Sequence, residues 1–142
     1  MIINAIKQFQ TLNGETACRV QLDSYNNFIV LKWLKLPAPA LMNEVIDCLT
    51  EVQDEHNASC ILNDIRGVDG LWSKMMEWAK SMPLTKTPSR DWCVANLIDN
   101  PIQTSIYESY LKHSLSDTVS VESFEDEQDA LYWLENCRCA KS

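Results

Sequence analysis

The chain has 142 residues, of which 46% are hydrophobic and 23% charged, which is typical of a folded globular domain. The net charge is −8 and Lys and Arg form no cluster, which argues against nucleic acid and anionic membrane as partners. No apolar run approaches the ~20 residues that span a bilayer, and the first ten residues lack a signal-peptide pattern. The sequence therefore predicts a cytoplasmic protein without an integral membrane segment.

The first third of the chain predicts a hairpin and a helix. Residues 1–14 fit a short strand or one helical turn equally well. From residue 18, apolar and polar residues alternate to residue 23, and a turn at residues 25–27 leads into an apolar run over residues 28–34 that only Lys32 interrupts. These runs predict an antiparallel hairpin. A helix is then expected over residues 38–56, with Pro39 in its first turn and Asn57 as its end.

The remainder predicts alternating strands and helices. Strands are expected at residues 59–65, 92–98 and 119–122, and helices at residues 72–82, 101–111 and 125–135. Residues 137–142 read as a flexible tail. This order predicts an α/β domain with one mixed sheet covered by helices, in which right-handed crossovers make the last three strands largely parallel. Residues 1–142 are expected to form one domain, with its core at about residues 15–136.

Two segments carry a family resemblance. The sequence CILNDIRGV at residues 60–68 precedes a Trp-containing helix, and FEDEQDALYWL at residues 124–134 closes the chain. With the hairpin and first helix, these segments resemble SpoIIAA-like proteins of the STAS superfamily. The resemblance implies a four- to five-stranded sheet with about four helices packed mainly on one side. It also implies a non-enzymatic regulatory or binding module that acts through protein partners.

The same resemblance bears on phosphorylation. In the antagonists of anti-sigma factors within this superfamily, a serine is phosphorylated at the start of the helix that follows this strand. Here Arg66 and Gly67 stand at that place, although the strand-end Asp is present as Asp64. Ser73 lies further along and does not match the pattern. Some SpoIIAA-like proteins are also likened to lipid-carrier domains.

The loop and helix after the strand at residues 59–65 form the candidate site, because open α/β sheets bind ligands at the carboxyl ends of their strands. In one reading, Asp64 and Arg66 recognise a polar group of a ligand or partner and Trp72 covers it. In the other reading, Asp64 and Arg66 form a pair that only fixes the loop, and Trp72 lies in the core. The Met- and Trp-rich helix could pack in the core, line an apolar cavity for a small molecule or lipid, or form a homodimer face. The ligand- or partner-binding candidates are Asp64, Arg66, Asp69, Trp72, Ser73, Met76 and Trp78.

Cysteines and acids complete the expectations. The six cysteines are expected to be mostly free thiols, with Cys93 among the buried ones and Cys137 and Cys139 in an exposed, oxidisable tail. No second Cys or His pair has ligand spacing, so neither a metal nor a cofactor is predicted. No catalytic motif is present, although an enzyme using Asp64, Arg66 and Cys93 remains a third reading. The acidic stretch at residues 114–136 is either a solvated face or a docking surface for a basic partner.

Overall fold

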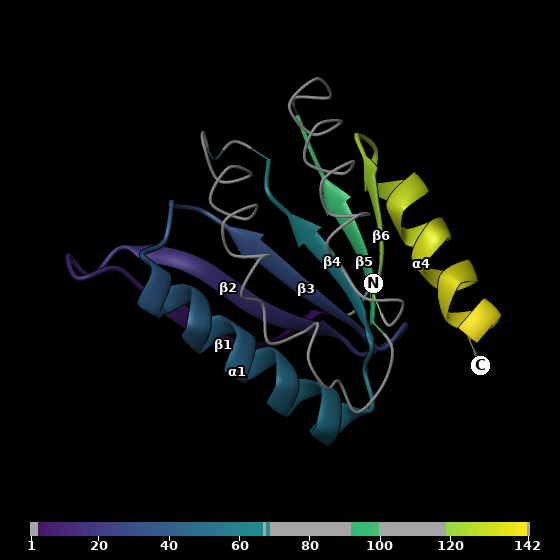
Figure 1. The fold of residues 1–142 in the computed structure, drawn as a ribbon, viewed down its shortest axis with the longest axis horizontal. Coiled ribbons are helices and arrows are strands. Elements are labelled where there is room, and N and C mark those ends of the chain that lie inside the picture. Colours follow the sequence, from purple (N-terminus) through teal and green to yellow (C-terminus); the bar gives the residue numbers. More distant parts are fainter. Residues whose placement is uncertain (1–2, 67, 69–91, 100–118, 142) are drawn as a thin grey trace.

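A computed structural model describes residues 3–66, 68, 92–99 and 119–141 of the chain (Figure 1). The strands are β1 (Ile3–Gln10), β2 (Thr16–Asp23), β3 (Phe28–Trp33), β4 (Cys60–Asp64), β5 (Trp92–Leu97) and β6 (Val119–Phe124). The helices are α1 (Pro39–His56) and α4 (Glu127–Lys141). The six strands form one sheet in the order β1-β2-β3-β4-β5-β6. No helix in the described ranges is long and apolar enough to cross a bilayer.

The sheet changes from antiparallel to parallel at β3. β1, β2 and β3 pair antiparallel, whereas β3, β4, β5 and β6 pair parallel. The predicted hairpin and the predicted parallel strands are therefore confirmed. The predicted four- to five-stranded sheet with about four helices is wrong, because the sheet has six strands and the described residues contain two helices. The helices expected at residues 72–82 and 101–111 lie outside the described residues.

The additional strand is β1, which the sequence left ambiguous. Seven of its eight residues are exposed and only Phe9 is buried. Because β1 lies at the edge of the sheet and has little buried surface, it lacks the strict apolar–polar alternation by which a half-buried strand is recognised. The strand also has irregular register at Ile6 and again near Gln10, which further disturbs the period.

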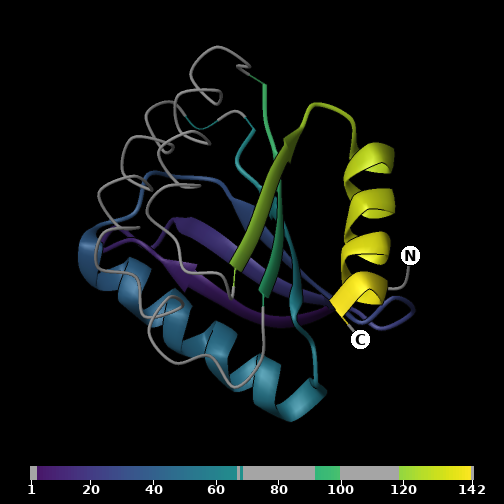
Figure 2. The same ribbon diagram turned by 45° about the vertical axis from the view of Figure 1, so that its right-hand side comes forward.

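The two helices lie on opposite faces of the sheet, as Figure 2 shows. Buried α1 residues such as Ile46 and Leu49 pack with Leu31 and Ile61, while Ala130 and Leu134 of α4 pack with Leu62. Successive strand residues point to opposite faces, so β4 supplies Ile61 to one core and Leu62 to the other. Burial of each such leucine or isoleucine stabilises the fold by roughly 1.5–3 kcal/mol. The expectation that helices pack mainly on one side does not hold for these two.

The ends of α1 follow the predicted signals. Pro39 lies in the first turn, and Asn57 ends the helix with a left-handed backbone at φ 57°. Asn27, in the β2–β3 turn, is also left-handed, at φ 58°. The Nδ2 of Asn27 donates to the carbonyl oxygens of His56 and Asn57, at 2.9 and 3.2 Å, which satisfies carbonyls that the end of a helix leaves unpaired.

A disulfide joins Cys93 of β5 to Cys137 of α4, with the two Cα atoms 6.5 Å apart. The expectation of free thiols is therefore wrong for this pair. The bond links α4 to the sheet, so Cys137 does not belong to a flexible tail. The reason is the continuation of α4 to Lys141, well past the predicted end at Glu135, since the helix then carries Cys137 over the sheet. Cys18, Cys48 and Cys60 are free and buried. Burial, reinforced by nearby Cys48, raises the pKa of Cys18 to about 12, which makes it an unreactive thiol.

Candidate functional site

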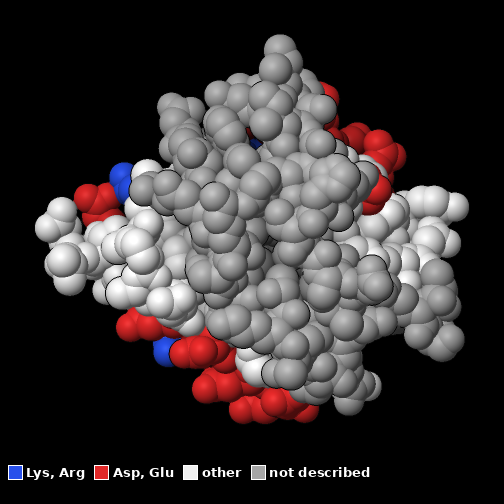
Figure 3. Space-filling model, in the orientation of Figure 1, with Lys and Arg blue, Asp and Glu red and all other residues white. Residues whose placement is uncertain are grey.

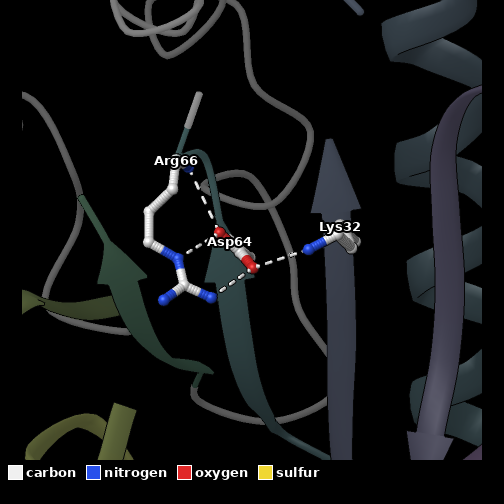
Figure 4. A network of polar contacts seen from close by, with 3 residues as sticks. All are labelled: Lys32, Asp64 and Arg66. Atoms are coloured by element: carbon white, nitrogen blue, oxygen red, sulfur yellow. Dashed lines mark hydrogen bonds and ion pairs between the residues drawn. The ribbon is translucent and has the colours of Figure 1, made fainter. Parts of the chain in front are cut away.

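Three charged side chains meet at the carboxyl ends of β3 and β4, and we call Lys32, Asp64 and Arg66 the strand-end cluster (Figure 4). The backbone N–H and the Nε of Arg66 donate to Oδ1 of Asp64 at 3.2 and 2.9 Å. Its Nη2 donates to Oδ2 at 2.9 Å, and Nζ of Lys32 donates to the same oxygen at 3.3 Å. Each oxygen of the Asp64 carboxylate therefore accepts two hydrogen bonds.

Burial and charge act in opposite directions on Asp64. Burial alone would raise the pKa of Asp64, but the hydrogen bonds from Arg66 and the positive charges of Lys32 and Arg66 outweigh it, so the pKa is lowered. The hydrogen bond with Asp64 in turn raises the pKa of Arg66. Both groups are thus ionised at neutral pH, and the cluster carries two positive charges against one negative charge.

This geometry separates a structural role from a binding role. Asp64 is 9% exposed, and its lone pairs are already used, so it fixes the turn after β4 and offers little to a ligand. Lys32 and Arg66 keep 45% and 41% of their side-chain surface exposed. Each therefore keeps N–H donors within reach of a ligand. Any recognition at this place therefore falls to the cations.

A third cation extends the cluster across the sheet. Gln8, Arg19, Lys32 and Asp64 are successive register partners on β1 to β4, so they share one face. This face is the one that carries α4, but α4 packs over β4, β5 and β6. The side of β1–β3 on this face, which we call the open half-face, keeps Arg19 and Lys32 partly exposed. Arg19 makes no ion pair with any residue in the described ranges.

Replacement of Asp64 by Asn tests the structural role. At pH 7 we expect the free energy of unfolding to fall by about 1–3 kcal/mol, because charge-assisted hydrogen bonds become neutral ones. Because the folded-state pKa of Asp64 is lowered, its stabilisation is present above the ordinary value of 3.8 and is lost as the pH falls through the folded-state value. Urea unfolding at neutral and acidic pH should therefore show that the wild type and Asp64→Asn differ less in free energy of unfolding as the pH falls through the folded-state pKa. A difference independent of pH would contradict this account.

A second polar group lies on the α1 face, one residue before the ends of β4, β5 and β6. Asn63, Asn96 and Ser123 are register partners there, and we call them the buried polar row. Nε1 of Trp33 donates to Oδ1 of Asn63 at 2.8 Å, and Nδ2 of Asn63 donates to Oδ1 of Asn96 at 2.9 Å. Because an indole can only donate, Trp33 sets the direction of both amides. Nδ2 of Asn96 and Oγ of Ser123 are buried and have no hydrogen-bond partner within the described ranges.

The structure tests the placement of the predicted residues in part. It brings Asp64 and Arg66 together, whereas Asp69, Trp72, Ser73, Met76 and Trp78 lie outside the described residues. The sequence reading missed Lys32 and Arg19 as site residues. A signal for both was present, since each is a cation in a strand whose neighbours are apolar. No group of three potential metal ligands occurs in the part of the chain that the structure describes.

Comparisons with known proteins identify no relative of this chain. No protein-family model matches the chain, and searches of curated proteins and of solved structures give no significant match. Any assignment of function therefore depends on the residues and their geometry.

Proposed function

We propose that the protein is a non-enzymatic binding module that contacts an acidic segment of a partner protein through its open half-face. The observation that supports this is the row of Arg19 and Lys32 on an incompletely covered sheet face, to which the saturated Asp64 carboxylate joins Arg66. The chain has a net charge of −8, so this group of three cations contrasts with its overall acidic character. A regulatory role of this kind is also what the resemblance to SpoIIAA-like proteins implies.

The chemistry favours carboxylates as the recognised groups. Asp64 holds the Arg66 guanidinium flat and fixed, so less side-chain entropy is lost when its outer donors engage a second carboxylate. Arg19 and Lys32 are opposite each other on neighbouring strands and could contact successive acidic residues. Positive charge placed this way raises the association rate and selects against basic partners.

A nucleic acid fits the same face less well. Arg66 lies within the field of two carboxylates, Asp99 and Glu127, and the whole chain is acidic. A continuous polyanion would meet this field along its length, whereas a short acidic peptide segment would not. Recognition of a partner protein therefore agrees better with the charge distribution.

The runner-up function is a carrier for a small molecule or lipid. It depends on the Met- and Trp-rich helix that the sequence predicts at residues 72–82, which lie outside the described residues. A cytoplasmic location belongs to the main proposal. The free, buried thiols of Cys18, Cys48 and Cys60 agree with it, whereas the Cys93–Cys137 disulfide is unusual for a reducing compartment.

Neutralising the open half-face tests the proposal. A photo-crosslinking residue in place of Gln21, beside Arg19 on the same strand, would capture the partner from a host extract, and the purified partner would then be titrated. We expect Arg19→Gln combined with Lys32→Gln to weaken that complex about tenfold or more, because two charge contacts are lost. Equal affinity of wild type and the double variant would overturn the proposal.

The control is Lys35→Gln, which removes one positive charge from an exposed lysine that pairs with Glu15 at 2.9 Å. This variant should bind the partner nearly as well as wild type. If it weakened binding as much as either single change in the open half-face, the effect would be one of net charge alone. Urea unfolding of each variant would verify that it is folded.

A further inference from the structure

The edge of the sheet at β1 has unused hydrogen-bonding capacity. β1 is the first strand in the sheet order and pairs with β2 on one side, so the backbone N–H and C=O groups on its other side pair with no strand among the described residues. The side chains of residues 3–8 are all exposed. The irregular register at Ile6 and near Gln10 leaves Lys7–Phe9 as the regular stretch in the second half of the strand.

A groove runs beside this stretch. It has a volume of about 420 Å³ and lies between β1 and α1, with Phe9 and Leu41 among its lining residues. Nζ of Lys7 lies 5.0 Å from the centre of the Phe9 ring, over its face. A strand added to the free side of β1 would have one of its two faces turned toward this groove.

The α1 side of the groove is acidic. Glu44, Asp47 and Glu51 line it, all three are exposed, and none forms an ion pair with a described residue. We call these three residues the acidic flank. Figure 3 shows Asp and Glu gathered along the lower edge of the molecule, where Figure 1 places α1. Among the described residues that line the groove, Lys7 is the one cation, so negative charge predominates there.

The spacing of these carboxylates suits an extended chain. At about 1.5 Å per residue, Glu44, Asp47 and Glu51 are separated by about 5 and 6 Å along the helix axis. Side chains on one face of a strand recur every ~6.8 Å. Lysine and arginine side chains are long enough to absorb this small mismatch.

We propose that β1 and the acidic flank bind an extended basic segment of a partner protein, which adds to β1 as a further strand. Its alternate Lys or Arg residues lie beside Glu44, Asp47 and Glu51, and its backbone pairs with β1. This surface is on the α1 side of the sheet edge and uses none of Arg19, Lys32 and Arg66, although Gln8 of β1 lies in their row and also lines the groove. It is therefore a second interaction surface of opposite charge, argued separately from the proposed function.

The charge of the flank decides between occupants. An acidic peptide, an anionic lipid surface and a nucleic acid would all be repelled by the three carboxylates. A second copy of the chain, paired through β1 about an axis normal to the sheet, would bring two acidic flanks together. A basic strand is the occupant that turns the same charges into attraction.

The test uses a labelled eight-residue peptide that alternates lysine and valine and so matches β1 in length. Fluorescence anisotropy at low ionic strength should show saturable binding to the wild-type protein. We expect the combined variant Glu44→Gln, Asp47→Asn and Glu51→Gln to weaken binding about tenfold or more, because three charge contacts are lost. The matched control makes the same charge change on the other side of the molecule, by Glu125→Gln, Asp129→Asn and Glu135→Gln, and should bind nearly as well as wild type.

A second peptide separates strand addition from simple charge attraction. N-methylation of alternate residues removes the donors of one peptide edge and leaves every lysine in place, so this peptide should bind much more weakly. Hydrogen exchange should become slower in β1 only when the unmethylated peptide is present. Equal binding of the two peptides, equal loss in the control variant, or no binding of the first peptide even at millimolar concentration would each overturn the proposal.

Discussion

Reduction of the Cys93–Cys137 disulfide is expected to lower the free energy of unfolding by about 2–4 kcal/mol. The two residues are 44 positions apart, so the bond removes a large loop-closure entropy from the unfolded chain. It also fixes the second half of α4 over the sheet, where Leu134 is completely buried. The loss should therefore be visible both in global stability and in the docking of α4.

Urea unfolding with and without a thiol reductant measures this effect, and alkylation of the denatured chain followed by mass spectrometry counts the oxidised thiols. Cys137→Ser is the control, because its stability should match that of the reduced wild type and should not change on addition of reductant. Superimposed unfolding curves of oxidised and reduced wild type would show that the bond contributes nothing to stability.

Asn63→Ala is expected to destabilise the fold by roughly 2–5 kcal/mol, the largest effect of any single substitution proposed for this chain. The substitution leaves Nε1 of Trp33 and Oδ1 of Asn96 buried without their partner, and each unpaired buried group costs about 1–3 kcal/mol. A small cavity adds to that cost. Urea unfolding monitored by Trp fluorescence measures the change.

A double-mutant cycle with Trp33→Phe identifies the cause. Phenylalanine has no N–H to leave unpaired, so Asn63→Ala should cost less in the Trp33→Phe background than in wild type. Additive losses would mean that the hydrogen bond between Trp33 and Asn63 is not the source of the effect.

The sequence predicted correctly those elements whose ends or neighbours carry a strong local signal. Pro39 and Asn57 locate the two ends of α1 because one residue fixes φ and the other tolerates the left-handed region. The parallel order of the last strands followed from their alternation with helices in the sequence prediction, since a crossover returns a strand in the same direction. Asp64 and Arg66 were identified together because they are two residues apart at a strand end.

Long-range features were not predicted. Nothing local links Cys93 to Cys137, and the disulfide arises only because α4 folds back over β5. Asn96 lies within a run that reads as an apolar strand, and its contact with Asn63 depends on the register of two strands far apart in sequence. Lys32 reads as an interruption of a strand until the fold places it against Asp64. The strand count was wrong because an edge strand buries almost nothing and so leaves almost no pattern.

The hydrogen bonds from Asn27 couple the opening of a turn to the opening of a helix end. They attach the β2–β3 turn to the last turn of α1, about thirty residues away, and α1 leads directly into β4. Fraying of the C-terminal end of α1 therefore releases the turn, and opening of the turn exposes the helix carbonyls. Amide hydrogens in these two places should exchange with one shared opening free energy, so the β2–β3 turn and the last turn of α1 open together in the native protein.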